Sequence, residues 1–233
     1  MSLRALTACA LSAAVLSVAP VHAAERTISV SDFDSLRVTG TMTVIVTESN
    51  ATAIRVSGDP RDLESVIAGV NAQKLTISLS HFGWGSSAVA HGPLVINITT
   101  PHLRAASLNG SGRLMIAHMR APRTEISMGG AGEVRVERLE TETFSAILSG
   151  SGRMQLAGKV AQAQLTATGS GTIDAVGLLA QDVKLGAQGA STIKATASRS
   201  ANAMATGASS ISVEGNPACT VNNVGAGVVS CGK

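Results

Sequence analysis

The chain has 233 residues, of which 45% are hydrophobic, 2% aromatic and 14% charged, and its formal net charge is +3. So much apolar sequence with so little net charge excludes an intrinsically disordered chain. The small charge and the scarcity of aromatic rings also exclude a strong nucleic-acid binder, which needs a basic surface or a row of stacking rings. We therefore expect a folded protein with no nucleic-acid partner.

Residues 1–23 have the layout of a secretory signal peptide. An apolar run over residues 5–19 precedes Val21-His22-Ala23, which fits a cleavage site with the cut after alanine. The run is too short for a transmembrane helix, and no later segment is long and apolar enough to span a membrane as a helix. Cys9 would suit a lipoprotein leader, an alternative that its early position disfavours. The mature chain, residues 24–233, is thus expected in the periplasm, outside the cell or on the cell surface.

Seven copies of a glycine-rich motif recur at intervals of 18 to 20 residues. Apolar and polar residues alternate on both sides of each motif, which predicts a short strand, a tight bend and a second short strand. We expect the leading glycine of each bend to adopt a positive φ or a close-packed turn. These glycines are Gly110, Gly130, Gly150, Gly169, Gly189, Gly207 and Gly225.

A repeat of about twenty residues matches one coil of a β-solenoid, in which no unit buries its apolar side alone and neighbouring units must stack. We predict an all-β fold with a single domain over residues 24–233. Residues 106–233 form a parallel β-helix of seven repeats, and residues 24–105 form an irregular β-rich part.

The charges in the repeats agree with this stacking. Equivalent residues of successive coils become direct cross-strand neighbours in a parallel stack, so like charges should not follow one another. Three residues after the leading glycine, Arg113, Glu133 and Arg153 alternate in sign. Asp174 and Lys194 are opposite in sign at another outward position. We expect both sets to lie side by side on the outer surface.

One helix is expected in the N-terminal part. Asp59 can cap it, Pro60 suits its first turn, and apolar residues follow at helical spacing, namely Leu63, Val66, Ile67 and Val70. A helix beside a solenoid commonly covers an open end, where strand edges would otherwise be exposed. Alternating apolar residues also surround Gly40, which resembles the later bends.

Cys219 and Cys231 are the two cysteines that remain once the leader is removed. An even number of cysteines in an exported chain favours a disulfide. Cys231 takes a core position of the last repeat, and Cys219 lies on the return part of the preceding one, so the two side chains can meet inside the last turn. We predict a Cys219–Cys231 disulfide that clamps this end, with two buried free thiols as the alternative.

The sequence contains no strong catalytic or metal-binding pattern, so we expect no cofactor and no metal site. The ligand-binding candidates lie in and near the loop over residues 81–87: Phe82 and Trp84 could stack on a sugar or anchor a partner, and the fold could bring His81 and His91 together beside them. Alternatively, the two rings pack into the core or onto the helix. The densest acidic group, residues 137–142, is interpreted as a solvated loop at a coil corner.

Several segments follow one another in a specific order before the repeats: Asp32-Phe33-Asp34-Ser35-Leu36-Arg37-Val38-Thr39-Gly40, Val44-Ile45-Val46, Val56-Ser57-Gly58-Asp59, Lys74-Leu75-Thr76-Ile77 and Pro101-His102-Leu103. This order resembles the bacterial head GIN domain family, also known as auto-transporter adhesin domains of unknown function. The resemblance extends from residue 27 to about residue 230. It implies an exported parallel β-helix with an adhesin label, and it supplies no catalytic motif.

Taken together, these features predict an exported, non-enzymatic binding or scaffold protein that is adhesin-like and acts through a rigid solenoid surface. Its partner would be an envelope protein or a glycan, and its oligomeric state stays open. The alternative is a carbohydrate-active β-helix lyase or hydrolase, which requires carboxylates gathered around one substrate. A purely structural module is a third possibility.

Overall fold

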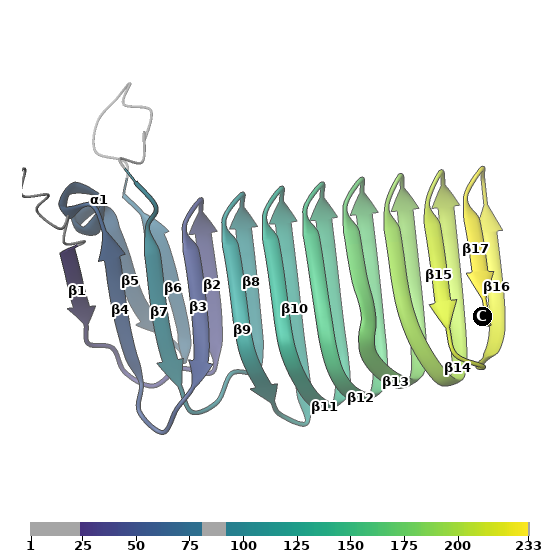
Figure 1. Cartoon of the computed structure of the whole chain (residues 1–233), viewed down its shortest axis with the longest axis horizontal. Coiled ribbons are helices and arrows are strands. Elements are labelled where there is room, and N and C mark those ends of the chain that lie inside the picture. The colour runs from purple at the N-terminus through teal and green to yellow at the C-terminus, as the bar shows by residue number, and fades with distance from the viewer. Residues whose placement is uncertain (1–23, 81–91, 233) are drawn as a thin grey trace, which may run out of the picture.

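The computed structural model describes residues 24–80 and 92–232, and over these ranges the fold is all-β, as predicted (Figure 1). A β-solenoid with a single short helix, α1 (Pro60–Ser65), makes up the described part of the chain. The strands are β1 (Ala24–Ile28), β2 (Ser35–Gly40), β3 (Thr43–Glu48), β4 (Ala53–Gly58), β5 (Val66–Asn71), β6 (Lys74–Leu79), β7 (Val95–Thr100), β8 (Ala105–Gly110), β9 (Arg113–Arg120), β10 (Arg123–Gly130), β11 (Glu133–Gly150), β12 (Arg153–Gly169), β13 (Thr172–Gly189), β14 (Thr192–Gly207), β15 (Ser210–Glu214), β16 (Ala218–Val224) and β17 (Val228–Cys231).

The solenoid is flattened into two faces. One face, which we call the β2 sheet, contains β6, β2, β8, β10, the C-terminal halves of β11 to β14, and β16. The other face, the β3 sheet, contains β7, β3, β9, the N-terminal halves of β11 to β14, β15 and β17. Glycine bends join the two faces along what we call the bend edge. At the opposite side, the return edge, the chain passes on to the next coil (Figure 1).

The coils are parallel and in register at the bends. Gly130 pairs with Gly110 and Gly150 with Gly130, and Gly40 extends this ladder toward the N-terminus by pairing with Gly110. All seven repeat glycines and Gly40 have φ between +85° and +131°, a region that side chains rarely adopt. A Cβ atom on Gly150 would also lie 2.3 Å from the carbonyl oxygen of Gly130. Both the backbone conformation and the close stacking therefore require glycine at these bends.

The charged side chains on the β3 sheet follow the predicted register. Glu133 pairs with Arg113 on one side and with Arg153 on the other, and Asp174 pairs with Lys194. The Nε atom of Arg113 donates a hydrogen bond of 2.8 Å to a carboxylate oxygen of Glu133. Exposed pairs of this kind contribute below about 1 kcal/mol each, so they mark the register more than they stabilise it.

The order of strands along the N-terminal part of the stack differs from their order in the chain. The pair β2/β3 lies between β6/β7 on one side and β8/β9 on the other. Beyond β6/β7, the stack ends in antiparallel strands: β4 pairs with β7, β1 with β4, and β5 with β6. The N-terminal strands therefore continue the same two sheets instead of forming a separate unit.

The predicted helix is shorter than its apolar pattern indicated. It begins as expected, with Asp59 accepting a hydrogen bond from the Arg61 amide and Pro60 in the first turn, but it ends at Ser65. The prediction that it extends to Val70 is wrong, because Val66–Asn71 forms β5 and pairs antiparallel with β6. Valine and isoleucine suit a strand at least as well as a helix, and the neighbouring edge of β6 supplies the backbone partners.

The acidic segment over residues 137–142 is also not a loop. It belongs to β11, which runs continuously around the return edge with a register shift between Val136 and Leu139. Leu139 points into the core, while Glu137, Glu140 and Glu142 are exposed. The interpretation as a loop is therefore wrong, whereas the solvated side chains at a coil corner are as expected.

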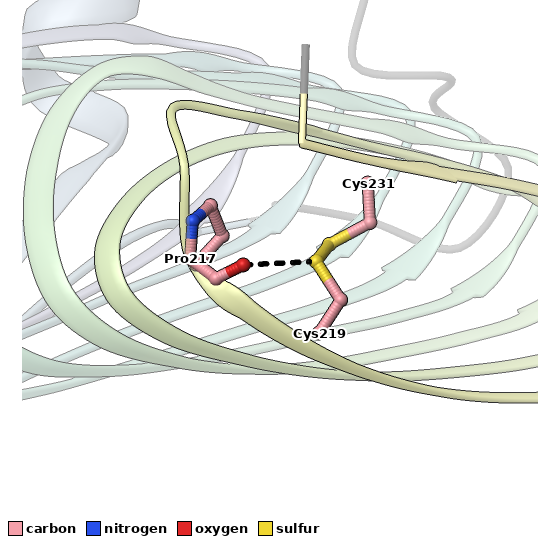
Figure 2. Close-up of a disulfide and its surroundings, with 3 residues drawn as sticks. All are labelled: Pro217, Cys219 and Cys231. Carbon is pink, nitrogen blue, oxygen red and sulfur yellow. Dashed lines mark hydrogen bonds between the residues drawn. A yellow bond between two sulfur atoms is a disulfide. The ribbon is translucent and has the colours of Figure 1, made fainter.

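The predicted disulfide is confirmed. Cys219 in β16 and Cys231 in β17 are bonded across the last coil, with their Cα atoms 6.4 Å apart (Figure 2). The Cys219 sulfur also lies 3.5 Å from the carbonyl oxygen of Pro217, a van der Waals contact, since an oxidised sulfur has no proton to donate. The crosslink joins the two faces of the solenoid at its C-terminal end.

Candidate binding surface at the return edge

The ligand-binding candidates from the sequence, His81, Phe82, Trp84 and His91, lie outside the described residues. In the sequence they follow β6 and precede β7. Within residues 24–80 and 92–232, no group of three metal-ligating side chains comes together. The same ranges contain no helix that is long and apolar enough to cross a membrane.

The most varied set of polar side chains lies at the return edge, around an open depression of about 710 Å³. We call this depression the return-edge groove. It lies where β3 and β9 end and β11 turns the corner. Acids, a base, an imidazole and a hydroxyl line it together, namely Glu48, His102, Arg120, Ala121, Pro122, Glu140, Thr141 and Glu142.

His118 connects the two sides of this groove. Its Nδ1 atom is hydrogen-bonded to a carboxylate oxygen of Glu48. Its Nε2 atom lies 3.8 Å from a carboxylate oxygen of Glu140, is buried, and has no hydrogen-bond partner in the described part of the chain. The bond to Glu48 requires a proton on Nδ1, because a carboxylate can only accept. His118 in β9 thus lies between an acid of the preceding coil, Glu48, to which it is bonded, and an acid of the following coil, Glu140, which it approaches without a hydrogen bond.

The parallel register explains why these groups meet. Glu140 is the direct cross-strand partner of Arg120, and its carboxylate lies 4.0 Å from the Arg120 guanidinium. These two residues are one repeat apart, so the period of the repeat could have predicted their pairing. Glu48 lies 70 residues before His118, and no sequence pattern connects them. Only the insertion of β2/β3 beside β8/β9 brings that acid to the groove.

A second open depression, of about 530 Å³, lies on the bend edge. Its charged members are the ladder residues Arg113, Glu133 and Arg153, and glycines and serines of the bends, such as Gly112 and Ser111, line it beside them. The surface is polar, but its charges are already arranged as alternating partners. It offers fewer kinds of donor and acceptor than the return-edge groove does.

A third charged group lies in the C-terminal half of the solenoid. The Arg199 guanidinium forms a two-point ion pair with Asp182, whose Oδ1 atom also accepts a hydrogen bond of 2.7 Å from the Ser200 hydroxyl. The hydrogen bond from Arg199, with that from Ser200, lowers the pKa of Asp182 to about 2. The same contact raises the pKa of Arg199. These groups satisfy one another, which makes them a structural pair on the surface.

The family model described as "Putative auto-transporter adhesin, head GIN domain" matches residues 32–217. The chain belongs to the head GIN domain family. The match ends just before β16, so the last coil and its disulfide lie outside the part that the family model describes. No curated protein matches the chain.

Solved structures share the fold of this head GIN protein at low sequence identity. A putative adhesin from Bacteroides fragilis is 22% identical with a TM-score of 0.80, and the match covers 91% of this chain and 97% of that one. A protein named as a putative lipid binding protein, from Parabacteroides distasonis, is 21% identical with a TM-score of 0.74, covering 92% and 98%. A putative adhesin from Parabacteroides merdae is 18% identical with a TM-score of 0.72, covering 92% and 98%.

Proposed function

We propose that this protein is an exported, non-enzymatic binding protein of the bacterial envelope, with an adhesin-like role, and that it binds its partner through the return-edge groove. The observation that carries the proposal is the packing of the interior. Apolar side chains from both faces fill the space between the sheets, for example Leu108, Leu114 and Ile116, each with no exposed surface. A ligand therefore has to bind on the outer surface.

The groove suits a polar partner that offers several hydroxyl or amide groups, which favours an envelope glycan, with an envelope protein as the other choice. Arg120 and His102 provide donors, and Glu140 and Glu142 provide acceptors. The Thr141 hydroxyl already donates to backbone carbonyl oxygens, so toward a ligand it is an acceptor. Residues on neighbouring coils are about 4.8 Å apart, a spacing that lets an extended ligand bridge two coils. The adhesin names carried by the family and its structural neighbours agree with such a role.

The groove can be tested with a binding screen on the mature protein. We expect residues 24–233 to retain defined glycans on an array, or to capture defined proteins from an envelope extract. The double variant Arg120→Ser, Glu140→Gln should lose that binding, and Lys184→Ser, on the exposed outer face of the β2 sheet, should keep it. Equal binding by wild type and by both variants would exclude the groove as the binding surface.

A further inference from the structure

The C-terminal end of the solenoid leaves two strands with a free edge. β16 pairs only with β14, and β17 only with β15, so within the described residues each has one side without a partner strand. A free strand edge presents a row of backbone donors and acceptors that can pair with another strand. Proteins usually protect such edges with lysines, prolines or bulges on the strand. Here Pro217 precedes β16, and neither β16 nor β17 contains a proline or a charged residue.

The same end also exposes apolar side chains. Seven large hydrophobic side chains are exposed in the described part of the chain, and three of them belong to the last coil: Val221, Val224 and Val228, at 47%, 59% and 66%. A fourth, Met204, is 51% exposed on the neighbouring strand, beside Asn222. Apolar surface and unpaired backbone thus coincide at one end of the molecule.

The charge distribution indicates what covers this end. Residues 215–232 contain no charged side chain. In an interface about a two-fold axis each surface meets its own copy, so any charge near the axis would face a like charge. A binding site for a different protein gains from opposite charges, which steer and orient the partner. Two edge strands without a charged side chain are therefore better suited to pair with a second copy of themselves than with a charged partner.

The strand lengths and the opposite end of the molecule favour the same arrangement. β16 has 7 residues and β17 has 4, so each strand matches its own copy in length better than it matches the other. At the N-terminal end, β1 carries Glu25 and Arg26, and α1 packs beside it, with Arg26 donating to the Leu63 carbonyl oxygen at 3.2 Å. Stacking head to tail would place the uncharged C-terminal edge against these charged groups.

We propose that two copies of this chain associate through their C-terminal ends about a two-fold axis, with β16 paired antiparallel to β16 and β17 to β17. Each face of the solenoid then continues across the interface as one sheet. The dimer is elongated and carries the return-edge grooves of both copies. The proposal does not depend on what the grooves bind.

The test is sedimentation velocity of residues 24–233, with the disulfide intact, over a dilution series. We expect a monomer–dimer equilibrium. Thr220→Lys and Thr220→Asp, on the exposed outer face of β16, should each raise the dissociation constant on the order of tenfold or more, because like charges then face each other near the axis. Mixing the two variants should restore the dimer. Ile147→Lys, which adds the same charge at an exposed position in mid-stack, should leave the equilibrium unchanged.

Hydrogen exchange of the wild type supplies a test that needs no variant. The amides of β16 should become more protected as the protein concentration rises, whereas those of β1 should not. A monomer at every concentration, a dimer that is insensitive to the Thr220 changes, assemblies larger than a dimer, or protection that rises at β1 would each overturn the proposal.

Discussion

At the N-terminal end of the solenoid, the strands beyond the parallel coils run antiparallel, and a helix lies beside them. At the C-terminal end, the last strand of each face is still parallel to its neighbour. The N-terminal end uses β1, β4 and β5, with Leu63 of α1 buried in the core. The C-terminal end uses the Cys219–Cys231 bond and adds no further element. The N-terminal end is covered by additional chain, whereas at the C-terminal end a covalent bond crosslinks the last coil and leaves its strand edges free.

The core changes between the two ends in a way that explains this difference. Among the buried hydrophobic residues that the structure describes, two of the 32 between Phe33 and Val160 are alanines, whereas ten of the 18 between Ala163 and Val213 are alanines. Alanine buries far less apolar surface than leucine or isoleucine, whose full burial is worth about 1.5–3 kcal/mol each. The C-terminal coils therefore gain less from packing, and a crosslink at their end offsets part of that weakness.

The last coil is also closed by a polar residue. Asn223 takes the inward position at which earlier coils have Leu108, Met128 or Leu148, as the register through Ala205 shows. Its side-chain amide donates to the Gly227 carbonyl oxygen at 2.7 Å, across the final bend. A polar side chain at a core position is tolerated here because no further coil of the same chain packs on it and because its amide has a hydrogen-bond partner. Terminal repeats of solenoids commonly depart from the pattern in this way.

The largest effect is expected in mid-stack, away from both ends. Gly150→Val should destabilise the protein by about 3 kcal/mol or more, because it combines a positive φ with a Cβ placed 2.3 Å from the Gly130 oxygen. Gly225→Val should lower the free energy of unfolding by less, since the last coil has a neighbour on one side only and can shift. Gly186→Val, where a Cβ meets nothing closer than 3.9 Å, is the control. Equal shifts of Tm for the first two variants would contradict the stacking argument.

Removing the crosslink should weaken the C-terminal end alone. The double variant Cys219→Ala, Cys231→Ala should lose about 3 kcal/mol in the chain-entropy model of a loop closed by residues 12 apart. Hydrogen exchange should then increase in β16 and β17 and stay unchanged in β1 and β4. An equal increase at both ends would show that the solenoid unfolds as one cooperative unit and not from its weaker end.

The matching change at the N-terminal end is Leu63→Ala. This change removes the buried contact of α1 and should lower the free energy of unfolding by about 2 kcal/mol. That is the lower end of the range for a core leucine, because the site borders solvent. Chemical denaturation measures the loss, and hydrogen exchange should show it in β1 and β4. Glu64→Ala, on the exposed side of the same helix, should change little. If protection falls in β16 instead, the two ends are coupled.

The smallest effect concerns acid stability in the C-terminal half. The pKa of Asp182 is about 2 in the folded protein against 3.8 for the free group, so its ion pair stabilises the fold above about pH 4 and is lost as pH falls toward 2. Wild type should therefore exceed Asp182→Asn in Tm at pH 6, and the difference should shrink at pH 2. The difference between wild type and Gln181→Ala should not change with pH. A constant difference for Asp182→Asn would exclude this pair as a source of acid sensitivity.

Much of this architecture could be predicted from local pattern. The spacing of the glycines predicts the coils, the alternation of apolar residues predicts the faces, and the charge series through Arg113 and Glu133 predicts the register. The disulfide followed from the same repeat, because it places Cys231 at a core position. These inferences succeed because each coil contacts only its neighbours, so contacts in space recur at a fixed distance in the sequence.

Where contacts do not recur along the sequence, only the tertiary structure decided which segments form strands and which residues meet. The segment after Ser65 is compatible with either a helix or a strand, and the free edge of β6 selects the strand. The insertion of β2/β3 between β6/β7 and β8/β9 joins Glu48 to His118 across 70 residues and adds this acid to the return-edge groove. The repeated part of the chain determined its own coils and register, whereas the N-terminal closure and the groove depend on long-range strand pairing, which local sequence does not encode.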